Sequence, residues 1–174
     1  MSNHDNIIIV KDSCILFDLI DLELMEEFYR LGLTVYTTQQ VIDEITDESQ
    51  SVAVSKYITT GKLLIDSNGL YDTIVLIYEE NRGLSFADSS VLEVAIRREG
   101  IVLSSDKSLR NVATRRNLIV RGVLWIIEEL CNKGIINVET ALNKLKIYSS
   151  INQRAPVSEI EKLIQKLKGR NTNF

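Results

Sequence analysis

The chain has 174 residues, of which 45% are hydrophobic and 25% charged, so it is long enough for one globular domain with a sizeable core. No apolar run approaches the roughly 20 residues that a membrane-spanning helix needs, and residues 1–6 lack the basic-then-apolar pattern of a signal peptide. The net charge of −4 argues against strong nonspecific binding to nucleic acid. We therefore expect a cytoplasmic protein with no membrane partner.

Short runs of strand-forming residues alternate with helical segments along the chain. This alternation predicts an α/β fold, in which a parallel central sheet is flanked by helices on both faces. Right-handed crossovers then bring the carboxyl ends of the strands to one edge of the sheet. The expected strands are 7–10, 33–36, 63–65, 101–103 and 118–120, and the expected helices are 18–31, 38–48, 51–60, 70–82, 86–99, 107–116, 122–133, 138–147 and 156–168.

The last part of the chain is predicted to be a helix with a short tail. We expect residues 1–150 to form the main domain, and residues 151–174 to pack on it or extend from it. Pro156 marks the start of the last helix and Gly169 its end, because proline favours the first helical turn and glycine the residue beyond the last turn.

Bases are concentrated in one part of the chain despite its acidic balance. Residues 97–121 hold seven bases against two acids. One interpretation is a solvated helix face with charged loops. The other is a surface that contacts phosphate groups close to the acidic residues discussed below.

Histidine and cysteine chemistry is nearly absent from the chain. His4 is the single histidine, which leaves almost no room for a histidine base or a histidine-rich metal site. Cys14 and Cys131 lie far apart in apolar contexts and are predicted to be reduced core residues. The glycine-rich motifs that cradle nucleotide phosphates are missing. Any catalysis therefore depends on Asp and Glu, with Ser, Lys and Arg as helpers.

Four acids stand where separate apolar runs end: Asp12, Glu44, Asp88 and Asp106. In a parallel sheet with its helices they can converge at the carboxyl edge, where open α/β sheets bind ligands. Carboxylates gathered there repel one another unless a cation lies among them. Oxygen ligands of this kind suit hard divalent cations. The spacing therefore predicts a Mg²⁺ or Mn²⁺ site, which Ser13 would help to orient.

Three of these acids also have a purely local interpretation. Asp12 is an ordinary helix cap or turn residue, and Glu44 an ordinary exposed acid on the flank of a helix. Asp106 precedes a predicted helix and can cap it. If Ser104 or Ser105 caps that helix instead, Asp106 stays available for a ligand.

Asp88 is the most informative of the four acids. With Leu92 and Ala95 it has the i, i+4, i+7 spacing of one helix face, so it heads an apolar face, whereas Glu93 points to the opposite side. A buried acid is costly unless it is paired or coordinated. Ser85 and Asp88 also match the capping-box pattern that starts a helix. The two interpretations are compatible.

These residues, in this order, resemble the motifs of PIN-domain nucleases, in the toxin-like prokaryotic branch of that family. The resemblance covers about residues 5–147 and implies a three-layer α/β/α fold. In that branch a Gly-Thr-Leu-like turn opens the helix after the last strand, where this chain has Gly122-Val-Leu. The matching pieces are Val10-Lys-Asp12-Ser13, Val41-Ile-Asp-Glu44-Ile, Leu84-Ser-Phe-Ala-Asp88-Ser-Ser and Leu103-Ser-Ser-Asp106.

The resemblance implies a metal-dependent enzyme that hydrolyses phosphodiester bonds in single-stranded RNA. Ser104 matches a small hydroxyl position that supports the family's site. Lys107 stands where many relatives carry a further acid, which leaves the number of metal ions, one or two, open. The implied Mg²⁺ or Mn²⁺ ligands, and catalytic residues, are Asp12, Glu44, Asp88 and Asp106.

The implied chemistry needs no histidine. A metal lowers the pKa of a bound water, and a carboxylate orients that water for in-line attack on phosphorus. Lys107 or Arg110 would contact the substrate phosphate and offset the charge of the transition state. The expected partners are RNA, an antitoxin protein of a toxin–antitoxin pair, and a second copy of the chain in a homodimer. The alternative is a PIN-like binding or scaffold module without catalysis.

Overall fold

The computed structural model describes residues 7–10, 13–153 and 155–171. The chain forms two compact units, and each unit is made of two separate segments of the sequence. The first unit consists of Met1–Leu16 and Gly32–Arg121, and the second of Phe17–Leu31 and Gly122–Phe174.

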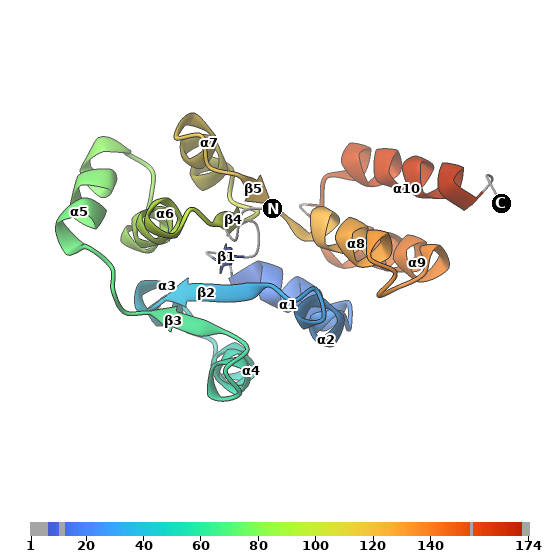
Figure 1. Ribbon diagram of the computed structural model, residues 1–174, viewed down its shortest axis with the longest axis horizontal. Coiled ribbons are helices and arrows are strands. Elements are labelled where there is room, and N and C mark those ends of the chain that lie inside the picture. The colour runs from blue at the N-terminus through green and yellow to red at the C-terminus, as the bar shows by residue number, and fades with distance from the viewer. Residues whose placement is uncertain (1–6, 11–12, 154, 172–174) are drawn as a thin grey trace. The chain divides into compact units, whose positions relative to one another are not determined.

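A sheet of five parallel strands lies at the centre of the first unit. The strands are β1 Ile7–Val10, β2 Thr34–Thr38, β3 Leu64–Asp66, β4 Ile101–Leu103 and β5 Val120–Arg121. Their order is β3-β2-β1-β4-β5, so the direction of winding reverses at β1 (Figure 1). Ile8 of β1 pairs with Val35 on one side, and Val10 pairs with Leu103 on the other. The predicted parallel sheet is confirmed, and its carboxyl ends lie along one edge.

Helix α6, Phe86–Arg98, is the central helix of this unit. It packs on β1, β2 and β4 as well as on α3 and α5, and for this reason every residue from Ala87 to Ala95 is buried. The described residues form ten helices and five parallel strands, which is consistent with the predicted three-layer α/β/α fold. The other helices of the unit are α3 Gln39–Asp43, α4 Glu48–Thr59, α5 Tyr71–Glu80 and α7 Lys107–Arg115.

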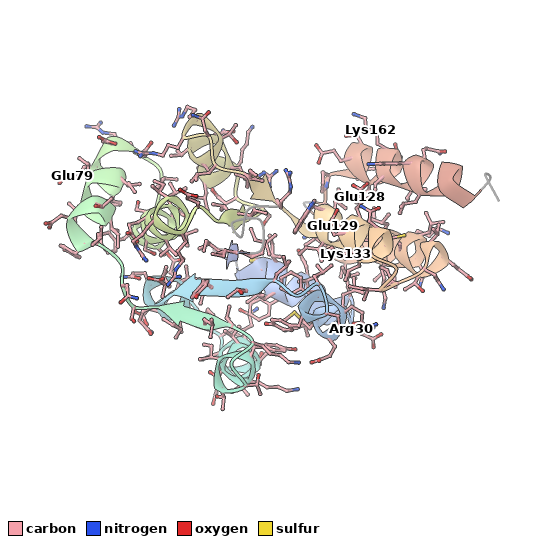
Figure 2. All side chains as sticks on the ribbon, viewed as in Figure 1. Arg30, Glu79, Glu128, Glu129, Lys133 and Lys162 are labelled. Carbon is pink, nitrogen blue, oxygen red and sulfur yellow. The ribbon has the colours of Figure 1, made fainter. Side chains whose placement is uncertain are left out.

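The second unit is helical. Helix α8 packs against α2, α9 and α10, and the ammonium group of Lys166 lies 2.5 Å from a carboxylate oxygen of Glu128, which Figure 2 labels on α8. Among the helices that the structure describes, none has both the length and the apolar character needed to cross a membrane. Helix α1, Ser13–Asp21, enters this unit from the first, and the remaining helices are α2 Met25–Tyr29, α8 Val123–Asn132, α9 Val138–Ile151 and α10 Val157–Asn171.

Two of the predicted helices are shorter in the structure than the sequence pattern indicates. The expected helix at 18–31 is interrupted because Glu23 adopts a left-handed φ of 53°. The expected helix at 38–48 ends early, and Asp47 starts α4 by accepting the backbone N–H of Gln50 at 2.9 Å. Caps and left-handed residues end these helices although the apolar pattern continues.

Two predictions about single residues are also wrong. Gly169 does not end the last helix, because α10 continues to Asn171. Cys14 is exposed and Cys131 half-buried, so neither is a core residue. Helix α1 buries the neighbouring Ile15 instead, and a helix face that buries one position leaves the next one about 100° away.

A buried ion cluster, consisting of Asp66, Glu93, Arg97 and Arg98, joins α6 to β3. Arg97 Nη2 lies 2.7 Å from Asp66 Oδ1, and Arg98 Nε lies 2.6 Å from Asp66 Oδ2. Arg97 Nε also lies 2.8 Å from Glu93 Oε1, and the Arg98 guanidinium lies 4.0 Å from the ring centre of Tyr36. The acid side chains are 0% and 1% exposed. The cluster contains two acids and two bases, and their pairing lowers the free-energy cost of burying the charges.

The cluster keeps Asp66 ionised inside the protein. Burial raises the pKa of Asp66, but hydrogen bonds from Arg97, Arg98 and the backbone N–H of Asn68 outweigh it and hold the pKa below its ordinary value. Hydrogen bonding to Glu93 raises the pKa of Arg97 further above its usual range. Both charges therefore persist near neutral pH, and α6 is held to the edge strand by charged hydrogen bonds.

Candidate active site

Asp88 lies in the buried first turn of α6 and completes a capping box. Its Oδ2 accepts the backbone N–H of Ser85 at 2.7 Å, while its own N–H donates to Ser85 Oγ at 3.0 Å. The residue is only 5% exposed, and Oδ1 is shielded from solvent. Both interpretations made from the sequence therefore hold, because Asp88 caps the helix and is also a buried acid.

A hydroxyl contact fixes this end of α6 to the carboxyl end of β2. Oγ1 of Thr38, the last residue of β2, lies 2.7 Å from Oγ of Ser90. Ser90 donates its single hydroxyl hydrogen to the carbonyl of Ala87, so Thr38 is the donor in the pair. Asp88 is therefore held near the edge at which the strands end, two residues before Ser90 on the same helix.

Ser104 and Asp106 follow the carboxyl end of β4. Ser104 is fully buried, and its Oγ accepts the backbone N–H of Asp106 at 3.1 Å. Asp106 is exposed and caps α7 through its Oδ1, which accepts the N–H of Leu109 at 2.8 Å. Of the two interpretations made from the sequence, the structure therefore contains the one in which Asp106 itself caps the helix, and not the one in which a serine does. Ser104 instead shapes the turn from which Asp106 extends.

Glu44 lies at the end of α3 rather than within a longer helix. It is the C-terminal cap residue of α3, with an exposed side chain. Helix α3 follows β2 directly and packs against α6, so its residues belong to the same side of the unit. Convergence of Glu44 with the other acids stays a prediction.

Asp12 lies outside the residues that the structure describes. Ser13 is the first residue of α1, and its side chain lies outside the description as well. Strand β1 ends at Val10, in register with Leu103 of β4. Strand β1 therefore ends at the same edge of the sheet as β4, which Ser104 follows.

The two bases expected to contact phosphate have different surroundings. Arg110 donates from Nη1 to the carbonyl of Ser104 at 2.8 Å and to that of Arg121 at 3.3 Å. Arg110 thus joins the segment after β4 to the end of β5 and stabilises this part of the structure. Lys107 is exposed at the first position of α7 and forms no ion pair with a described acid. Of the two bases, Lys107 is the more exposed, and its contact with a substrate phosphate stays a prediction.

The carboxylates of the described acids are the candidate ligands for a divalent cation. Within residues 7–10, 13–153 and 155–171, no three His, Cys, Asp or Glu side chains form a group that could hold a metal ion. Magnesium commonly uses only one or two carboxylates, together with water and substrate phosphate. Asp88 and Asp106 supply hard oxygen donors of that kind, so the chemistry of the described donors fits Mg²⁺ or Mn²⁺.

The buried ion cluster and the Thr38–Ser90 contact were not foreseen from the sequence. Glu93 and Arg97 have the i, i+4 spacing of an ion pair on a helix, which was a usable local signal. No local signal relates Asp66 to Arg97, 31 residues away, or Thr38 to Ser90, 52 residues away. These contacts depend on the crossing of α6 over the sheet.

A parallel sheet with a buried aspartate near its carboxyl edge defines a class of α/β proteins that bind ligands at that edge. Within this class, the chain belongs to the PIN-domain family, since a family model described as PIN domain matches residues 8–169. The resemblance noted from the acidic motifs is thereby confirmed.

One curated relative gives further information. Endoribonuclease Nob1 of Methanocaldococcus jannaschii is 35% identical to this chain over 104 residues. The match covers 58% of this chain and 50% of the relative, so the chain spans about half the length of the curated relative that it matches.

Proposed function

We propose that this protein is a metal-dependent endoribonuclease that hydrolyses phosphodiester bonds in single-stranded RNA. The observation that carries the proposal is the buried carboxylate of Asp88 at the start of α6, near the carboxyl edge of the sheet. Membership of the PIN-domain family and the similarity to a protein named as an endoribonuclease support it. A Mg²⁺ or Mn²⁺ ion would be held by Asp12, Glu44, Asp88 and Asp106.

The chain's own groups have separate tasks in this proposal. A carboxylate such as Asp106, exposed at the edge, orients the attacking water and accepts its proton. The water oxygen then forms a bond to phosphorus while the bond to the leaving ribose oxygen breaks. Lys107 and the positive ends of α6 and α7 offset the negative charge of the transition state. When bound, the cation would supply Lewis-acid chemistry at the phosphate and acidify the attacking water.

Metal binding is tested by thermal stabilisation. With Mn²⁺ at about 100 times its dissociation constant, linkage stabilises the folded state by about 2.7 kcal/mol, so the melting temperature of the wild type is expected to rise and to fall back with a chelator. Asp88→Asn should lose most of that rise, whereas Glu79→Gln, an exposed acid on α5 (Figure 2), should keep it. RNA cleavage with Mg²⁺ or Mn²⁺, against a chelated sample, tests the activity itself. An equal melting temperature with and without Mn²⁺ would count against the metal site.

A non-catalytic PIN-like module is the second candidate. In such a module the four acids do not share a cation, and among the described residues, which leave out Asp12, no three His, Cys, Asp or Glu side chains form a group that could hold one. Such a module would bind RNA or protein but would neither cleave RNA nor be stabilised by Mn²⁺. The two assays above therefore separate the candidates.

We also propose, as part of the same function, that the nuclease acts in the cytoplasm as the toxin of a toxin–antitoxin pair. Expression of the wild type is then expected to arrest bacterial growth, and Asp88→Asn is expected to relieve the arrest because the cleavage site is lost. Growth that is equal for the two forms would point to a housekeeping nuclease. Co-expression of an antitoxin should restore growth. The predicted homodimer is tested by measuring the mass of the purified protein in solution.

A further inference from the structure

Three aromatic rings form a small cluster where α5 meets α6. We call Tyr71, Tyr78 and Phe86 the aromatic platform. The ring centre of Phe86 lies 5.9 Å from that of Tyr71 and 6.0 Å from that of Tyr78. The two tyrosines are seven residues apart on α5, about two helical turns, so they lie on one side of it. Figure 1 shows α5 beside α6, and the two helices pack against each other.

The two tyrosines of α5 are exposed and are not needed to pack this helix against the core. Tyr71 is 67% exposed and Tyr78 46% exposed, whereas Ile74 and Ile77 on the inner side of α5 are buried. The isoleucines therefore fix α5 to the core, and the tyrosine rings have faces left for a ligand. Aromatic surface left open in this way commonly marks a binding site.

The platform adjoins the candidate active site. Phe86 is the first residue of α6, and Ser85 and Asp88 form the capping box of the same helical turn. Arg82, exposed on the turn between α5 and α6, adds a positive charge four residues before Phe86 in the sequence. Phe86 and Asp88 thus lie in the same first turn of α6, so the platform and the candidate active site share this end of the helix.

We propose that the aromatic platform stacks nucleobases of single-stranded RNA and so positions the strand beside Asp88. The proposal rests on the proposed ribonuclease function. Bases in single strands stack on exposed aromatic side chains whatever their sequence. On α5 the acids Asp72 and Glu79 lie about 80–120° around the helix from the tyrosines, and they repel phosphate there. The strand is therefore directed to the side of the platform on which Phe86 of α6 packs.

Binding of a short RNA that contains 2-aminopurine, measured in EDTA with the full chain, tests the platform without cleavage. Tyr71→Ala and Tyr78→Ala should each weaken binding about tenfold, because each removes a stacking surface. The fluorescence of 2-aminopurine should be quenched by the wild type and much less by the double variant. Tyr71→Phe and Tyr78→Phe keep the ring and should bind as the wild type does. Leu76→Ala, which removes another exposed side chain from α5, is the matched control and should change nothing.

The outcomes separate this proposal from the function on which it rests. Equal binding by the wild type and both alanine variants overturns the platform, and so does an absence of quenching; the exposed rings would then suit a protein partner. Wild type that binds RNA through the platform but cleaves none of it overturns the ribonuclease function and leaves the platform standing. Melting temperatures within a few degrees of the wild type confirm that the alanine variants are folded, and the phenylalanine variants give a second check.

Discussion

Asp88→Asn is expected to reduce RNA cleavage on the order of 10³-fold or more while the protein stays folded, a loss comparable with removal of a main electrostatic group from an active site. The side-chain oxygen of asparagine can still accept the N–H of Ser85, so the capping box survives. The negative charge that would hold a cation is lost. The measurement is the single-turnover cleavage rate in Mg²⁺ or Mn²⁺, with circular dichroism to verify the fold.

Ser85→Ala is the control for this variant. It removes the hydroxyl that accepts the Asp88 N–H but keeps the carboxylate, so it should cost about 1 kcal/mol of stability and reduce cleavage far less. If purified Asp88→Asn cuts RNA as fast as the wild type, the assignment of this residue is wrong. If both variants lose cleavage together, the helix cap rather than the carboxylate is what the reaction needs.

Asp66→Asn is expected to be the most destabilising single change in the buried ion cluster. Removing the charge of one partner leaves Arg97 and Arg98 partly buried without their shared carboxylate, which costs about 3 kcal/mol. Urea unfolding followed by circular dichroism measures the free energy of unfolding. Glu80→Gln breaks an exposed ion pair with Arg116 at 2.8 Å and should cost under about 1 kcal/mol. Equal losses in the two variants would show that burial does not strengthen the cluster.

The lowered pKa of Asp66 predicts that the loss of stability in Asp66→Asn depends on pH. The pKa of Asp66 is lower in the folded protein than its ordinary value of 3.8, so the folded state favours the ionised form. Its contribution is fully present above about pH 5, well above the ordinary value, and is lost as the pH falls through the lowered value. The difference in unfolding free energy between the wild type and Asp66→Asn should therefore be constant from pH 7 to about pH 5 and shrink in more acidic solution. A difference that grows on acidification would contradict the pKa direction.

Much of the fold could be predicted because its signals are local. Alternation of short apolar strands with helices indicates a parallel sheet, and this was confirmed. The capping box of Ser85 and Asp88 was visible as a spacing of three residues, and the structure contains it. Interactions between residues a few positions apart leave a recognisable spacing in the sequence, so they can be predicted from it.

Other features of the site were decided by competition between local signals. Asp106 caps α7 although two serines precede it, and Glu44 ends α3 because Asp47 starts a new helix. Several residues in each stretch can cap a helix, and the difference in free energy between them is a few tenths of a kcal/mol to about 1 kcal/mol. Packing of the surrounding helix is enough to select one.

The tertiary structure alone decided which distant side chains meet. Asp66 pairs with Arg97 and Arg98, and Thr38 with Ser90, because α6 crosses the sheet over β2 and next to β3. Helical spacing indicated that Asp88 heads a buried face, but it placed Glu93 on the opposite side, and Glu93 is buried as well. Spacing contains no information on which strand lies beneath the helix. The strand order and the direction of α6 arise from burying the apolar faces of all the elements together, and a cooperative term of this kind is not contained in any local segment.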